Sequence, residues 1–200
     1  MIKQNYIWQP TPKFISESNL TKYIKFISQN YAFESSGSYN ELWQWSIDNP
    51  KLFWDSIWDF SEVKGDKGER ILINSNLMPG AKFFPDAELN YAENLLKNSD
   101  DKVSIISIRE DGKKKLISKN ELKTKVMLMA AWLKKKGIKK GDRVAAYMPN
   151  CLETVISMLA TSALGAVFSS CSTDFGVAGV LDRFKQIQPK ILITVDGYIY

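Results

Sequence analysis

The sequence contains no histidine and only two cysteines, Cys151 and Cys171. Without histidine it lacks the usual general base, the Ser-His-Asp and Cys-His arrangements, and the commonest metal ligand. The two cysteines fall at a predicted helix start and a predicted strand end. This pattern argues against a disulfide scaffold or a thiolate metal site, and we interpret both as buried free thiols.

Long apolar runs and the common nucleotide-binding motifs are also missing. No stretch approaches the roughly 18 to 20 uninterrupted apolar residues that span a bilayer, and the start, Met1–Asn5, has no apolar signal core. We therefore expect a cytoplasmic protein with no membrane partner. No Gly-x-Gly-x-x-Gly follows a strand, and neither Gly-x-x-x-x-Gly-Lys nor Gly-x-Ser-x-Gly occurs. The classical dinucleotide-binding, P-loop and hydrolase classes are thereby excluded.

Arginine is scarce, although the net charge is +5, because only four of the 27 basic residues are Arg. Arg is the side chain suited to bidentate phosphate and guanine contacts, whereas Lys is a hydrated surface charge. The lysine clusters 113–115, 134–136 and 139–140 fall at a turn, a helix end and a second turn. We interpret them as solvated faces and expect no nucleic-acid partner.

Aromatic residues are plentiful and unevenly placed. Of the 24 aromatic residues, 14 lie in the first 60 positions, including five of the six Trp, and the composition changes near Lys64–Gly68. Two regions are therefore predicted. The aromatic layer is a possible stacking platform for bases, but clustered Trp more often packs a small core or an interdomain face, which is the interpretation we favour.

The first region is predicted to be mainly helical. Apolar residues recur at helical spacing from Leu20 to Tyr31, Ser38–Glu41 has the pattern of a capping box, and Asn49-Pro50 resembles an N-cap followed by a first helical residue. Residues 69–100 are interpreted as a connector with a short strand, a loop and a helix capped by Asn90.

The second region alternates strands and helices. Val103–Ile108 and Lys115–Ile117 are predicted to form a hairpin, and Ser118–Glu121 is a second capping-box pattern. The remaining predicted elements are strand 143–148, a helix to Leu164, strand 166–170, helix 175–188 with Val177, Val180, Leu181, Phe184 and Ile187 inward, and strand 190–195. This order implies a parallel sheet with right-handed crossovers.

Two loops of this sheet qualify as ligand sites, because ligands of open α/β sheets bind at the carboxyl ends of the strands. In the loop after strand 143–148, Asn150 is predicted to be the N-cap of the next helix. The loop Ser169–Gly176 offers small polar side chains before a helix N-terminus that could face an anionic or nucleotide ligand. Asp174 favours a role as helix cap there, with ligand contact as the alternative, since its carboxylate would repel a phosphate.

Several segments carry a family resemblance that extends from Trp8 to Tyr198. The matching segments are Tyr39–Ser46, Phe53-Trp54, Phe83–Pro85, Leu89–Leu96, Gly141–Asn150, Leu159–Gly165, Ser169–Val177 and Leu181–Lys190. On these residues the sequence resembles the amino-terminal third of the acetoacetyl-CoA synthetases, which are adenylate-forming acyl-CoA ligases. The Ser-Cys-Ser-x-Asp-Phe-Gly and Asp-Arg-Phe-x-Gln-Ile segments are the most specific, because the related acetyl-CoA synthetases carry a Phe-Gly-Gly-Phe-Ser type of loop.

The resemblance implies that the whole enzyme activates acetoacetate with ATP and Mg²⁺ through an acyl-adenylate and then transfers the acyl group to CoA. It also implies that Ser172, Thr173 and Asp174 lie beside the adenine end of CoA, although Thr173 stands where the family is expected to have proline. The family's phosphate loop, acidic motif, ribose-binding Asp and catalytic Lys match nothing in this sequence. We therefore assign no catalytic residue and no metal ligand, and we expect the chain alone to be inactive.

The predicted fold class is α/β. Residues 1–100 are expected to form an aromatic-rich helical region of acyl-CoA synthetase type, and residues 101–200 the first part of a parallel-sheet AMP-binding domain that is cut off after strand 190–195. One alternative function is a ligase for another short acid, such as acetate or propionate. Another is a non-catalytic module that binds CoA or nucleotides, or an interaction domain.

Overall fold

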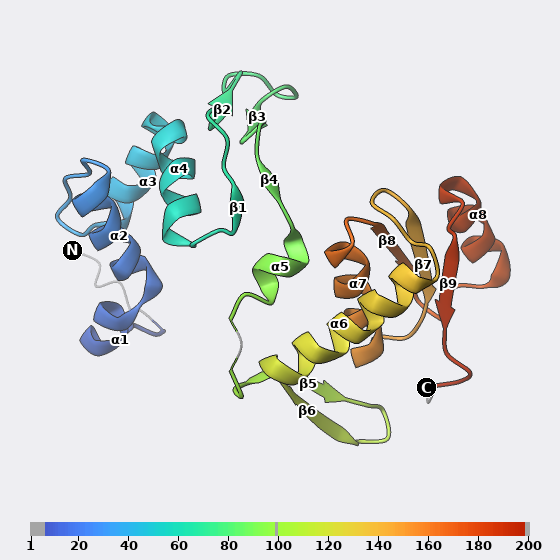
Figure 1. Cartoon of the computed structure of the whole chain (residues 1–200). Helices are drawn as coiled ribbons and strands as arrows, with labels where there is room; N and C mark the ends of the chain where they lie inside the picture. Colours follow the sequence, from blue (N-terminus) through green and yellow to red (C-terminus); the bar gives the residue numbers. More distant parts are fainter. Residues whose placement is uncertain (1–6, 99, 199–200) are drawn as a thin grey trace. The chain divides into compact units, whose positions relative to one another are not determined.

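The computed structural model describes residues 7–98 and 100–198 and divides the chain into two compact units, Met1–Leu89 and Asn90–Tyr200 (Figure 1). The segment Met1–Asn5, interpreted above as lacking a signal core, lies outside the described residues. The helices are α1 (Pro12–Glu17), α2 (Asn19–Asn30), α3 (Tyr39–Asp48), α4 (Pro50–Phe60), α5 (Tyr91–Leu95), α6 (Lys119–Lys135), α7 (Leu152–Ala163) and α8 (Val177–Ile187). The strands are β1 (Gly65–Asp66), β2 (Leu72–Ile73), β3 (Lys82–Phe83), β4 (Glu88–Leu89), β5 (Val103–Ile108), β6 (Lys114–Ser118), β7 (Arg143–Tyr147), β8 (Val167–Cys171) and β9 (Ile191–Thr194).

The core of the first unit lies among α2, α3 and α4. Its buried apolar residues are Tyr23, Ile27, Phe33 and Leu42, and five further aromatic side chains pack around them. The hydroxyls of Tyr23 and Ser56 form a buried hydrogen bond of 2.7 Å, which satisfies both groups away from water. Most of the aromatic layer therefore packs a core, as favoured from the sequence, although Trp8, Trp43 and Trp54 are exposed.

Two pairs of two-residue antiparallel strands complete the first unit. β1 pairs with β4, and β2 pairs with β3. The ammonium group of Lys67 contacts Asp59 and lies 2.7 Å from Asp55, so it joins the segment after β1 to α4. The sequence predicted only one short strand in residues 69–100, because two-residue strands contain too few positions to show alternation.

The helix ends of the first unit differ from prediction in one respect. α3 begins where expected, but the Ser38 hydroxyl makes no capping hydrogen bond. The Glu41 carboxylate accepts hydrogen bonds from Ser35 and Ser36 instead, so the predicted capping box at Ser38 is wrong. Asn49 occupies the N-cap position of α4, but its side chain makes no capping hydrogen bond. The side-chain amide of Asn49 instead donates to the Trp45 carbonyl at 3.3 Å.

In the second unit, the predicted capping box at Ser118 is confirmed. The Glu121 amide donates to the Ser118 hydroxyl at 3.1 Å, and the Ser118 amide donates to the Glu121 carboxylate at 2.8 Å. α6 then packs Leu122, Val126 and Leu133 into the core. The predicted cap at Asn90 is also confirmed, because its side-chain oxygen accepts from the Glu93 amide at 3.1 Å.

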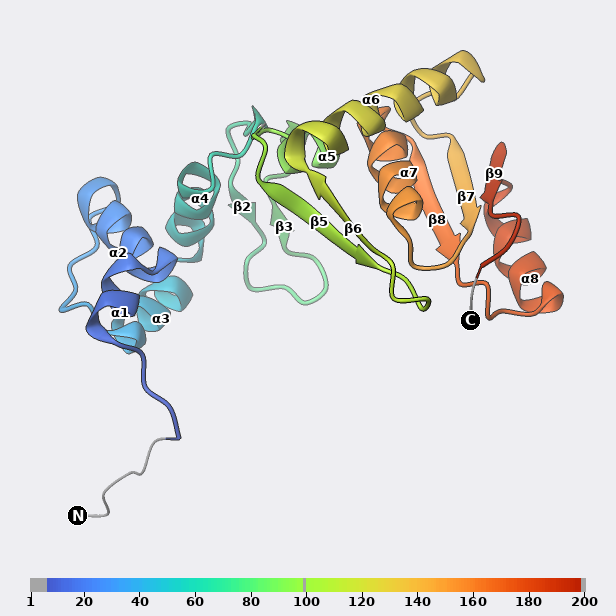
Figure 2. The same ribbon diagram turned by 90° about the horizontal axis from the view of Figure 1, so that it is seen from below.

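The three parallel strands of this unit form a sheet in the order β8-β7-β9, which confirms the predicted parallel sheet. On one face, Val144, Ile191 and Ile193 join the core that includes α6 and α7. On the other face, Ala145 and Cys171 pack against Phe184 of α8. The sheet therefore lies between α6 and α7 on one side and α8 on the other (Figure 2). The predicted inward positions of α8 are only partly right, since Val177 and Leu181 are exposed.

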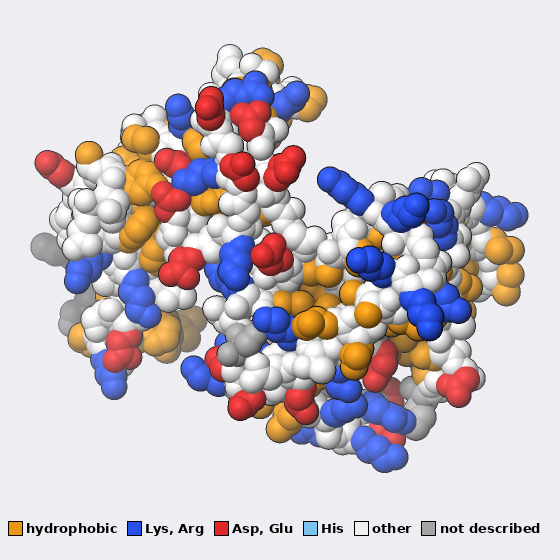
Figure 3. All heavy atoms as spheres, in the orientation of Figure 1, with side chains coloured by type: hydrophobic (Ala, Val, Ile, Leu, Met, Phe, Trp, Pro, Cys, Tyr) orange, Lys and Arg blue, Asp and Glu red, His pale blue; other side chains and the backbone are white. Residues whose placement is uncertain are grey.

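The surface agrees with the interpretation of the lysine clusters. All eight of these lysines are exposed, and Figure 3 shows basic, acidic and apolar side chains interspersed on the visible face of each unit. Both cysteines are free, Cys171 buried and Cys151 partly so. Within residues 7–98 and 100–198, no helix combines the length and the apolar character needed to cross a bilayer.

Candidate functional site

The carboxyl ends of β7, β8 and β9 meet at one edge of the sheet. From β7 the chain passes to β8 on one side and then to β9 on the opposite side, so the strand order reverses between β7 and β9. Such a reversal opens a crevice between the loops that leave the strands, and ligands of open α/β sheets bind there.

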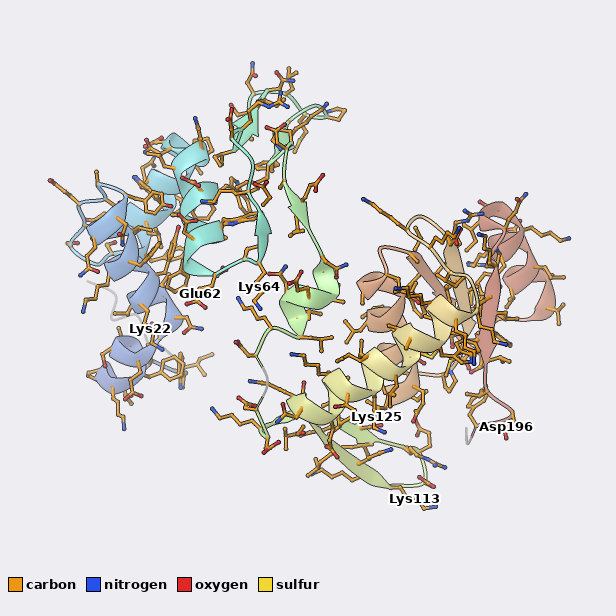
Figure 4. All side chains as sticks on the ribbon, in the orientation of Figure 1. Lys22, Glu62, Lys64, Lys113, Lys125 and Asp196 are labelled. Atoms are coloured by element: carbon orange, nitrogen blue, oxygen red, sulfur yellow. The ribbon has the colours of Figure 1, made fainter. Side chains whose placement is uncertain are left out.

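A pocket of about 490 Å³ lies at this edge, within the size range of small-molecule sites. Four segments line it: Ser107–Glu110 at the end of β5, Pro149–Cys151 with Glu153 after β7, Ser172–Asp174 after β8, and Val195, Gly197 and Tyr198 after β9. Figure 4 labels two neighbours of these segments, Asp196 in the loop after β9 and Lys113 in the turn of the β5–β6 hairpin. All three candidate residues predicted from the sequence thus line one pocket.

The Ser172–Asp174 segment is shaped by its own hydrogen bonds. The Ser172 hydroxyl donates to the Asp174 carboxylate at 2.7 Å and accepts from the Asp174 amide at 3.3 Å. α8 begins only at Val177, and its N-cap position is Gly176. The prediction that Asp174 caps this helix is therefore wrong, because the carboxylate lies two residues before the cap and is held by Ser172.

The predicted N-cap role of Asn150 is also wrong. The N-cap position of α7 is Cys151, which makes no side-chain capping hydrogen bond. The Thr154 hydroxyl donates to the Pro149 carbonyl at 2.9 Å and ties the first turn of the helix to the loop. Asn150 is exposed and lines the pocket instead.

The charged side chains of the pocket wall are mostly acidic. Glu110, Glu153 and Asp174 carry negative charge, and the single basic residue of the wall, Arg109, forms an ion pair of 3.1 Å with Asp111. An acidic wall repels phosphate and attracts N–H and O–H donors. The pocket therefore suits the base or sugar of a nucleotide better than its phosphates.

Among the residues that the structure describes, no three His, Cys, Asp or Glu side chains gather as metal ligands would. No residue among those described is therefore assigned to a metal ion.

Sequence reasoning missed two walls of the pocket, which come from the β5–β6 hairpin and from the segment after β9. The β5–β6 hairpin is far from the other loops in sequence, and no local sequence pattern predicts that Ser107–Glu110 line the pocket. Tyr198 was missed because the order of the strands in the sheet could not be predicted from the sequence. That order places the loop after β9 beside the loop after β7, where the strand order reverses.

Two family models match the chain. The AMP-binding enzyme model covers residues 92–199, and the model of the acetyl-coenzyme A synthetase N-terminus covers residues 39–95. The first match spans more than half of the chain and includes every segment of the pocket. The chain therefore belongs to the AMP-binding enzyme family.

The curated relatives narrow this assignment. The chain is 40% identical over 194 residues to an acetoacetyl-coenzyme A synthetase of Rhizobium meliloti, a match to 97% of this chain and 30% of that protein. It is 41% identical over 205 residues to the acetoacetyl-CoA synthetase of Xenopus tropicalis, with 100% and 30% covered. It is thus a homologue of the acetoacetyl-CoA synthetases and corresponds to their amino-terminal portion.

A solved structure confirms the fold class. Acetoacetyl-CoA synthetase from Streptomyces lividans superposes with a TM-score of 0.88 at 36% identity, over 96% of this chain and 30% of that one. The chain spans about 30% of the length of the relatives that it matches.

Proposed function

We propose that this chain supplies one wall of the CoA site in an ATP-dependent acetoacetate–CoA ligase. In this proposal the whole enzyme uses acetoacetate, ATP, Mg²⁺ and CoA, and the AMP-binding region begins near residue 101. The cytoplasmic location expected from the sequence stays part of the proposal. The observation that carries it is the convergence of Ser172, Thr173 and Asp174 on the pocket at the strand-order reversal.

The chemistry of the pocket supports the adenine end of CoA as the occupant. The adenine amine and the free 2′-hydroxyl of the ribose can donate hydrogen bonds to the carboxylates of Asp174 and Glu153. The phosphates of CoA would meet repulsion from the same carboxylates, so we place them outside this wall.

Titration calorimetry with two ligands tests the proposal. We expect CoA to bind the chain and pantetheine, which lacks the nucleotide, to bind at least about tenfold more weakly. Equal affinity for both would contradict a site for the adenine end. A folded chain that binds neither would contradict a CoA site altogether.

A ligase for another short acid remains the alternative within the class, because the proposed site concerns CoA and not the acid. A thioester assay on the whole enzyme with acetoacetate, acetate and propionate separates these readings. Activity confined to acetate or propionate would overturn the acetoacetate assignment. A whole protein that binds CoA without forming any thioester would favour the non-catalytic module.

A further inference from the structure

Tyr147, the last residue of β7, contacts the candidate loop from the sheet. Its hydroxyl lies 2.9 Å from the carbonyl oxygen of Thr173 and 2.9 Å from that of Phe175, and it donates to these two acceptors. The two carbonyls flank Asp174. One hydroxyl therefore restrains the backbone on both sides of the central candidate residue.

Tyr147 lies behind the pocket wall rather than in it. Its ring is half-buried and packs against the cluster of Ala145, Cys171 and Phe184 under α8. The described residues that line the pocket do not include it. Any effect of Tyr147 on a ligand in the pocket must therefore pass through the loop.

A second contact restrains the loop from the helix side. The guanidinium of Arg183 lies 4.4 Å from the centre of the Phe175 ring and donates to the Gly179 carbonyl at 3.0 Å. The hydrogen bonds between Ser172 and Asp174 give the loop its local shape, but they do not attach it to the sheet. Among the side-chain hydrogen bonds of the residues that the structure describes, that attachment comes from Tyr147.

We infer that Tyr147 is a positioning residue that holds the backbone of Thr173–Phe175 in the geometry that binds the ligand. The inference rests on the proposed CoA site for its ligand. The loss of a hydrogen bond that only orders the loop is expected to weaken binding by about three- to tenfold.

Hydrogen exchange and CoA titration of Tyr147→Phe test the inference. The Phe175 amide donates to the Ser172 carbonyl at 3.2 Å and reports the order of the loop. We expect this amide to exchange at least about fivefold faster in the variant, the CoA dissociation constant to rise by about three- to tenfold, and Tm to change by less than about 4 °C. The control variant, Tyr91→Phe, changes an exposed tyrosine of α5 and should match the wild type.

The outcomes separate this inference from the CoA proposal. Local loosening at Phe175 in a chain that binds no CoA would support the positioning role and contradict the ligand. Unchanged exchange at Phe175 would overturn the positioning role, whatever CoA does. Faster exchange throughout residues 90–198 would also overturn it, because Tyr147 would then be a general structural residue.

Discussion

The ammonium group of Lys190 lies 2.7 Å from the carboxylate of Asp142 and joins the start of β9 to the start of β7. The other carboxylate oxygen of Asp142 accepts from the Lys139 amide at 2.8 Å. Arg143, the next residue, donates to the Ile187 carbonyl at the end of α8 at 2.8 Å. These contacts fix the amino-terminal edge of the sheet, opposite the edge that carries the pocket.

Stability should depend on the charge of Asp142. The Lys190 ammonium and the Lys139 amide hold the pKa of the Asp142 carboxyl below its ordinary value of 3.8. A carboxyl whose pKa is lower in the folded state than in the unfolded state stabilises the fold at pH values above its ordinary pKa. This stabilisation is lost as the pH falls through the folded-state pKa. We expect the free energy of unfolding to decline below about pH 4, and to decline less in Asp142→Asn.

Urea unfolding followed by circular dichroism at several pH values between about 7 and 3 measures this difference. The two proteins should differ most at neutral pH and converge in acid. Asp100 also has a lowered pKa, through its hydrogen bond with Lys119, so some dependence on pH should persist in the variant. Parallel curves at all pH values would contradict the role of Asp142.

Two serines in the same sequence pattern should differ in their contribution to stability. Ser118 forms a full capping box at α6, whereas Ser38 makes no capping hydrogen bond at α3. We expect Ser118→Ala to lower the free energy of unfolding by about 1 kcal/mol and Ser38→Ala to lower it by less than about 0.5 kcal/mol. Chemical denaturation of both variants checks this, and equal losses would refute the assignment of the caps.

The helices of the first unit contain one buried and one exposed isoleucine, which make a matched pair for substitution. Ile27 is fully buried in α2, whereas Ile47 on α3 is 52% exposed. Ile27→Ala leaves a cavity and should cost about 2 to 5 kcal/mol, while Ile47→Ala should cost less than about 1 kcal/mol. Urea unfolding followed by tryptophan fluorescence measures both, and a small loss for Ile27→Ala would mean that this core is poorly packed.

We expect the 200-residue chain alone to catalyse neither adenylation nor thioester formation. The catalytic motifs that the family resemblance implies match nothing in its sequence. Acetoacetate-dependent exchange of pyrophosphate into ATP is the sensitive assay. Exchange above that of a heat-denatured sample would prove the expectation wrong.

The predicted helices with long apolar periodicity agree with the structure, as α2 and α6 illustrate. Their burial patterns are set by residues within one element, so the sequence alone contains the necessary information. The capping predictions were less reliable, because a cap depends on competing partners. At α3, for example, the Ser38 hydroxyl makes no capping hydrogen bond, while the Glu41 carboxylate accepts hydrogen bonds from Ser35 and Ser36.

Only part of the candidate site could be predicted from the sequence, because its other walls depend on tertiary structure. The polar run Ser172–Asp174 could be found as a loop after a strand, and it does line the pocket. Its partners could not be found, because Arg109 and Tyr198 reach the pocket only through the tertiary placement of the hairpin and of β9. Asp174 was assigned to the helix because α8 was predicted to begin two residues early.

The central claim, that Ser172 and Asp174 contact CoA, is tested most directly by calorimetric titration of CoA into matched variants. The double variant Ser172→Ala with Asp174→Ala removes both side chains, and Asp182→Ala removes an exposed carboxylate of α8 that does not line the pocket. We predict that the double variant binds CoA at least about tenfold more weakly than the wild type, whereas Asp182→Ala binds it within about twofold. Equal CoA affinity in all three proteins would contradict the assignment.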